Sequence, residues 1–86
     1  MKKLILRRLI NKRKIGGSHT ALINLSKGFP SHFSSTKKGK KLIEKAIKEL
    51  INDNLLLAKQ STNEKHVSVN PRKSKEIQIL LGINSF

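Results

Sequence analysis

Along this sequence the spacing of hydrophobic residues changes from that of a helix to that of β-strands. This change predicts a fold in which helices are followed by a pair of strands. Residues 36–53 predict a long helix, because their apolar side chains recur at helical spacing. These side chains are Leu42, Ile43, Ala46, Ile47, Leu50 and Ile51. Beyond residue 54, an apolar run at residues 55–59 and an alternating run at residues 65–70 flank a polar stretch. This second pattern predicts a β-hairpin.

Shorter helices are predicted around these elements, over residues 2–14, 19–27 and 71–81. Gly16 and Gly17 are expected to end the first helix, since glycine accepts the left-handed conformation that a helix C-terminus requires. Asn70 followed by Pro71 is a typical start for the last helix, with asparagine as the cap. The expected fold class is therefore mainly α with a β-hairpin, as one domain over residues 1–86.

This layout resembles the winged helix-turn-helix superfamily. The resemblance rests on the short helix at residues 20–27, the turn around Pro30, and residues 41–56, where a helix ends in leucine, polar residues, a turn and an apolar strand. It implies the element order α-α-α-β-β-α, with residues 36–53 as the recognition helix and residues 57–70 as the wing. A short, basic, cysteine-free chain rich in Lys, Ile and Asn also looks like a small archaeal protein of this kind.

Two features depart from the superfamily's pattern and leave the start of the recognition helix open. The linker at residues 29–35 is longer than a compact turn, and Gly39 lies early in the helix. Either Gly39 permits close approach of the backbone to a phosphate, or the helix starts only at Lys40. The residues suited to cap it are Ser34, Ser35 and Thr36.

The charge of the chain predicts a polyanionic partner. Nineteen Lys and Arg against five Asp and Glu give a net charge of +14. The excess is uneven: residues 1–50 hold fourteen basic and two acidic side chains, whereas residues 51–86 hold five and three. Such an excess increases self-repulsion in the compact state, and it is common where nucleic acid is bound.

Contacts with nucleic acid are predicted first from the recognition helix, because lysines and hydroxyls suit phosphate oxygens. The residues at its start and on its outer face are Ser34, Ser35, Thr36, Lys37, Lys38, Lys40, Lys41, Lys45 and Lys48. Arg7, Arg8 and Arg13 are expected to add a second contact, from the end of the first helix or as an arm in the minor groove. The wing offers Lys59 and Lys65. Each of these groups also fits a solvated basic surface.

The types of side chain in the recognition helix predict modest base specificity. Lysine is a point charge without the bidentate fork of arginine, so it positions the protein better than it reads bases. The helix contains no arginine and no glutamine. The predicted function is therefore double-stranded DNA binding with weak or modest sequence preference, in transcriptional regulation. The alternatives are an RNA-binding or ribosome-associated winged helix protein and a protein-interaction module.

The residue patterns needed for catalysis or for a cofactor are missing from the sequence. There is no cysteine, the five acidic residues do not cluster, and no glycine-rich phosphate loop occurs. His19 and His32 flank the second helix, where two imidazoles without further ligands would make a poor metal site. We therefore expect no enzymatic activity, no cofactor and no metal. Phe29 and Phe33 are expected to fill the core, which leaves no aromatic platform for single-stranded nucleic acid.

Neither a membrane span nor a secretory leader is predicted, since Arg7 interrupts the apolar run at residues 4–6. The acid-free, amphipathic start of the chain also fits a mitochondrial transit peptide, but the absence of cysteine and the role of these residues in the fold favour the cytoplasm.

The last helix carries more apolar surface than one face requires. Ile79 and Ile83 lie away from the face formed by Ile77, Leu80 and Leu81. This excess predicts a homodimer through the C-terminal helix, or else a helix buried on two sides against the first helix.

Overall fold

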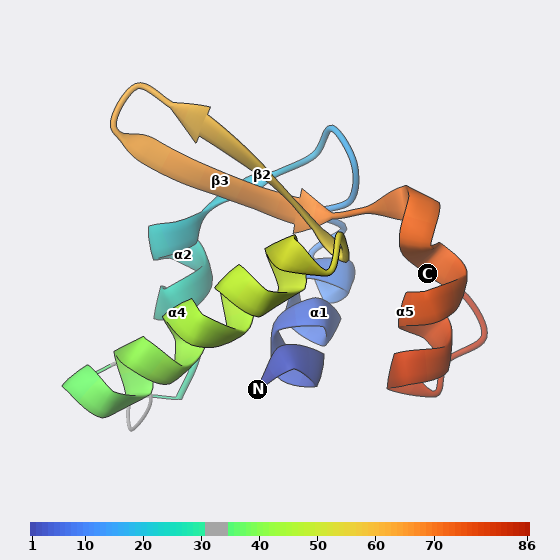
Figure 1. The fold of residues 1–86 in the computed structure, drawn as a ribbon, viewed down its shortest axis with the longest axis horizontal. Coiled ribbons are helices and arrows are strands. Elements are labelled where there is room, and N and C mark those ends of the chain that lie inside the picture. The colour runs from blue at the N-terminus through green and yellow to red at the C-terminus, as the bar shows by residue number, and fades with distance from the viewer. Residues whose placement is uncertain (31–34) are drawn as a thin grey trace.

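A computed structural model describes residues 1–30 and 35–86 of the chain (Figure 1). The described part is a mixed structure of helices and one antiparallel sheet. Its elements in chain order are α1 (Lys2–Asn11), β1 (Thr20–Ala21), α2 (Leu22–Lys27), α4 (Lys37–Asn52), β2 (Leu56–Ser61), β3 (Glu64–Val69), a 3₁₀ turn η1 (Pro71–Lys73) and α5 (Ser74–Leu81). In Figure 1 the sheet lies above α1, α2 and α4, and α5 stands beside α1.

The predicted hairpin is confirmed, with longer strands and a tighter turn than expected. β2 and β3 pair in register from Leu56 opposite Val69 to Ser61 opposite Glu64, so only Thr62 and Asn63 form the turn. The polar residues at 60–64 therefore belong partly to the strands. Their composition favours a turn, but it does not show how far the backbone pairing continues.

The prediction of a helix over residues 19–27 is wrong at its start, because the chain first forms the short strand β1. Thr20 pairs with Val67 and Ala21 with His66, so β1 joins the outer edge of β3 and the sheet order is β1-β3-β2. α2 begins only at Leu22. Two residues carry no periodic signal, and their strand conformation depends on a partner distant in sequence, which explains the error.

The first helix ends three residues earlier than predicted, at Asn11. Arg13 adopts a left-handed conformation with φ 57°. Its N–H donates to the Ile10 carbonyl at 2.9 Å, and the Lys14 N–H donates to the Leu9 carbonyl at 2.8 Å. This bond pair is the Schellman arrangement, here with arginine where glycine is usual. Gly16 instead follows the helix, where its N–H donates to the Val69 carbonyl at 2.9 Å.

The start and the end of the last predicted helix agree with the structure, except for the conformation of its first turn. The Asn70 side chain accepts a hydrogen bond from the Arg72 N–H at 3.1 Å, which confirms Asn70 as a cap. The turn that follows is a 3₁₀ turn, and the α-helix begins at Ser74. Gly82 ends α5 in the left-handed conformation.

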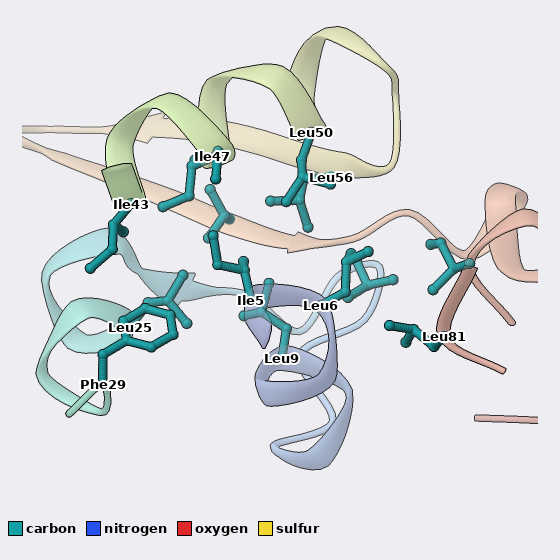
Figure 2. Packing of buried hydrophobic residues seen from close by; sticks show 14 residues of the cluster. Ile5, Leu6, Leu9, Leu25, Phe29, Ile43, Ile47, Leu50, Leu56 and Leu81 are labelled. Carbon is teal, nitrogen blue, oxygen red and sulfur yellow. The ribbon is translucent and has the colours of Figure 1, made fainter. Parts of the chain in front are cut away.

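The core lies between the sheet and the helices, and every helix contributes to it (Figure 2). Its members are Ile5, Leu6, Leu9, Leu25, Phe29, Ile43, Ala46, Ile47, Leu50, Leu56, Val67, Val69, Ile77 and Leu81. Phe29 is buried as expected, whereas Phe33 lies outside the described residues. In α5, Leu80 is 38% exposed and Ile79 is 83% exposed, so the expectation that this helix is buried on two sides is wrong.

Candidate nucleic-acid interface

α4 begins at Lys37, with Thr36 as its cap. The Thr36 hydroxyl oxygen accepts a hydrogen bond from the Gly39 N–H at 2.9 Å, which satisfies one of the free donors of the first turn. Gly39 is buried inside that turn. Both alternatives for Gly39 are therefore wrong: the helix starts before Lys40, and no phosphate can reach the Gly39 backbone from solvent.

The buried and exposed faces of α4 separate cleanly. Ile43, Ala46, Ile47 and Leu50 enter the core together with Gly39. The lysines of this helix are all exposed: Lys37, Lys38, Lys40, Lys41, Lys45 and Lys48. Four of them lie opposite the buried face at helical spacing, and we call Lys37, Lys41, Lys45 and Lys48 the lysine face. Its two end lysines are about eleven positions apart, a length of about 16 Å along the helix axis.

Neither acidic residue of α4 forms an ion pair with the lysine face in the described structure, although the charge of Lys45 contributes to the lowered pKa of Glu49. Glu49 points to α1, where its carboxylate lies 2.9 Å from the Lys2 ammonium. The hydrogen bond from Lys2 and its charge hold the pKa of Glu49 below the ordinary value, and the same bond raises the pKa of Lys2. Glu44 and Lys48 are four residues apart on this helix, but no ion pair forms between them in the described residues.

The start of α4 combines several positive charges. A helix N-terminus carries a partial positive charge, so acidic side chains are favourable there and lysines are not. The first turn of α4 contains no acidic residue and holds Lys37, Lys38 and Lys40. This arrangement costs helix stability and creates a strongly positive surface at one end of the lysine face.

Arg7 and Arg8 are occupied by contacts within the protein. An Arg7 guanidinium nitrogen donates to the Leu81 carbonyl at 3.1 Å and so joins α1 to the end of α5. The Arg8 guanidinium lies over the Phe29 ring, 5.9 Å from its centre. It also packs against Gly28 so closely that a Cβ atom at that position would collide with it. Because both arginines belong to a packed helix, they do not form an arm for the minor groove.

Arg13 is exposed beyond the C-terminal end of α1, together with Lys12. Among the three arginines predicted to contact nucleic acid, Arg13 is the one whose guanidinium has no partner within the described residues. The other predicted origin of this contact, the end of the first helix, stays a prediction for these arginines.

The two wing lysines point to opposite faces of the hairpin. Lys59 lies opposite His66, whereas Lys65 lies opposite Gln60, and neighbouring residues on a strand alternate in direction. Both are exposed. A flat surface can therefore contact one of them but not both, whereas a partner that wraps around the hairpin tip can contact both.

Ser34 and Ser35 are the remaining hydroxyl residues predicted to contact nucleic acid. Ser35 is exposed just before the cap of α4. Ser34 lies outside the described residues, as does His32.

His19 meets a histidine that sequence reasoning did not connect with it. Its Nδ1 atom lies 3.0 Å from Nδ1 of His66, and the rings meet edge to face. The Nε2 atom of His66 lies 3.3 Å from the Glu64 carboxylate. The two histidines are 47 residues apart and come together only because β1 pairs with β3, so no local pattern could have predicted this contact.

Within residues 1–30 and 35–86, no three His, Asp or Glu side chains gather as a metal site would require. The helices described there are all too short or too polar to cross a bilayer. Comparison of the chain with models of protein families, with curated proteins and with solved structures finds no match.

Proposed function

We propose that this protein is a winged helix-turn-helix protein that binds double-stranded DNA through the lysine face of α4 and acts in transcriptional regulation. The observation that carries the proposal is the lysine face itself: four exposed lysines in line, none of them in an ion pair in the described structure, opposite a packed apolar face. A row of positive side chains along one helix can contact successive phosphates of a nucleic-acid backbone.

The arrangement of elements supports the winged-helix part of the proposal. α1, α2 and α4 precede the β2–β3 hairpin, which is the layout of helices and wing that defines this fold (Figure 1). The added strand β1 holds the hairpin to the body of the protein through β3. In this assignment α4 is the recognition helix and the turn at Thr62 and Asn63 is the tip of the wing.

The dimensions of α4 suit a duplex. The major groove of B-DNA is about 12 Å wide and admits an α-helix. Because the lysine face spans about 16 Å, its two ends can reach phosphates on both walls of the groove. Lysines contact phosphates without reading bases, so the proposed interaction has high affinity at low salt and weak sequence preference.

The proposal is tested by fluorescence anisotropy with labelled duplex DNA, duplex RNA and single-stranded DNA over a range of salt concentrations. Each phosphate neutralised on B-DNA contributes about −0.9 to the slope of log affinity against log salt, so the four residues of the lysine face predict a slope of about −3.6 or steeper. Duplex DNA should bind more tightly than either other probe.

Other results would replace the proposal. Tighter binding to duplex RNA would assign the protein to RNA metabolism or the ribosome. Preference for single strands would contradict the proposal, since Phe29 is buried and offers no stacking surface. An affinity for duplex DNA that does not change with salt would exclude phosphate contacts by the lysine face.

A further inference from the structure

His19 and His66, which we call the histidine pair, meet on the face of the sheet that is turned away from the core. Val67 and Val69 enter the core, and neighbouring residues of a strand alternate in direction, so His66 lies on the other face of β3. His19 lies two residues before Ala21, which pairs with His66. The contact between their Nδ1 atoms, at 3.0 Å, therefore joins the segment before β1 to β3.

The histidine pair adds a side-chain contact to a very short backbone pairing. β1 is two residues long, so its pairing with β3 provides few hydrogen bonds. The loop before β1 is held to the sheet at Gly16, whose N–H donates to the Val69 carbonyl at 2.9 Å. The Gly16 carbonyl accepts a hydrogen bond from the Ser68 hydroxyl at 2.8 Å. The contact of His19 with His66 lies between this attachment and β1.

The distance between the Nδ1 atoms implies that one proton lies between them, because one ring nitrogen donates and the other accepts. The Nε2 atom of His66 lies 3.3 Å from the Glu64 carboxylate, which favours a proton on that nitrogen. In the neutral pair, Nδ1 of His66 therefore accepts and Nδ1 of His19 donates. If His66 becomes charged, the direction reverses and the contact survives, because His19 can then accept.

A second positive charge is incompatible with the contact. When both imidazoles are protonated, both Nδ1 atoms carry a proton and neither can accept. Lys59 lies opposite His66 on β2 and lines the same hollow as the histidine pair, so it adds to the repulsion. Glu64 can balance one of these charges but not all of them. β1 contributes no ionisable side chain, and the helices pack against the other face of the sheet.

We propose that the histidine pair is a pH-sensitive switch that holds residues 17–21 against β3 at neutral pH and releases them in acid. Histidine is the side chain that ordinarily changes its charge between about pH 5 and pH 8. The folded pair keeps its contact with one shared proton, whereas the unfolded chain accepts a proton on each ring. The contribution of the contact is therefore present at neutral pH and is lost as pH falls through the histidine range. The inference does not depend on the proposed function, because it is measured without nucleic acid.

Hydrogen exchange of the full chain, followed residue by residue by NMR at about pH 7.5 and about pH 5, tests the switch. Rates are compared as protection factors, which remove the direct effect of pH on exchange. Protection of Thr20 and Val67, which pair between β1 and β3, should fall about fivefold or more in acid, the effect of one lost hydrogen bond. The circular dichroism spectrum should stay the same, which excludes unfolding of the whole chain.

Two substitutions of His19 separate the switch from other effects of pH. His19→Asn places an amide near the position of Nδ1. An amide donates and accepts without titrating, so the contact with His66 should persist and the loss of protection in acid should disappear. His19→Ala removes the contact, so protection of Thr20 should already be about fivefold below the wild-type value at neutral pH.

Glu64→Gln is the matched control, because it removes the ion pair with His66 but leaves both Nδ1 atoms in place. In this variant acid should still lower the protection of Thr20. Unchanged wild-type protection in acid, a His19→Asn protein that keeps the wild-type pH dependence, or loss of that dependence in Glu64→Gln would overturn the proposal.

Discussion

Arg13 occupies a backbone conformation that few residues accept. At φ 57° an L-amino acid brings its Cβ close to the backbone, at a cost of about 1–2 kcal/mol, and glycine avoids this cost. The position is nevertheless required to be left-handed, because the bonds from Arg13 and Lys14 close the end of α1. The side chain is exposed, so its removal breaks no packing.

We expect Arg13→Gly to raise the free energy of unfolding by roughly 0.5–1 kcal/mol, after the larger chain entropy of glycine in the unfolded state is subtracted. Chemical denaturation with urea measures this change. Lys12→Gly is the control, because Lys12 has an ordinary φ of −88° and should gain nothing from glycine. A loss of stability in Arg13→Gly would contradict the strain assigned to this position.

The ion pair between Lys2 and Glu49 joins the start of α1 to α4 and should make stability depend on pH. The hydrogen bond from Lys2 lowers the pKa of Glu49 from 4.5, so its contribution is present above that value and is lost as pH falls through the folded-state pKa. The bond to Glu49 raises the pKa of Lys2 from 10.5, so that contribution is lost only as pH rises through the higher folded-state value.

We therefore expect Glu49→Gln to lower the melting temperature at neutral pH and to have no effect in strong acid, where the wild-type pair is also broken. Thermal unfolding followed by circular dichroism between about pH 2 and pH 8 measures the difference, with the lower limit about two units below the ordinary carboxyl pKa. Glu44→Gln, on the same helix but without an ion pair in the described structure, should not show this pattern. An equal pH dependence in both variants would exclude the pair as its cause.

Among the elements, α4 was the most predictable from sequence because its signals agree. A complete apolar stripe, a cap and a left-handed Asn54 after the helix give boundaries within one residue of the prediction. β1 was not predictable, since it depends on its pairing with β3. The end of α1 was missed because Arg13 takes the left-handed position that glycine usually occupies. The lysine face follows from helical spacing, whereas the internal roles of Arg7 and Arg8 depend on tertiary packing.

The lysines in the first turn of α4 are expected to lower the stability of the protein and to raise its affinity for duplex DNA. Lys38→Glu places an acidic side chain near the positive end of the helix and should raise the free energy of unfolding by about 0.3–1 kcal/mol, while duplex affinity falls. Urea denaturation and fluorescence anisotropy measure the two effects. Lys48→Glu makes the same change of charge farther from the helix start and should lack the stabilisation. If Lys38→Glu destabilised the protein, the electrostatic account of this turn would be wrong.

At the scale of the whole molecule, the lysine face and the most exposed large hydrophobic side chain of the described part lie on different helices. The lysine face lies on α4, whereas Ile79, which is 83% exposed, lies on α5, and α5 stands beyond α1 from α4 (Figure 1).

The central claim is that phosphate binding belongs to the lysine face and does not follow from net charge alone. The most direct test compares the salt dependence of duplex DNA binding in two double variants with equal loss of charge. Lys41→Ala/Lys45→Ala should make the slope shallower by about 1.8, the contribution of two phosphates. Lys12→Ala/Lys75→Ala removes two exposed lysines elsewhere and should leave the slope close to that of the wild type. Equal changes in the two variants would contradict the claim.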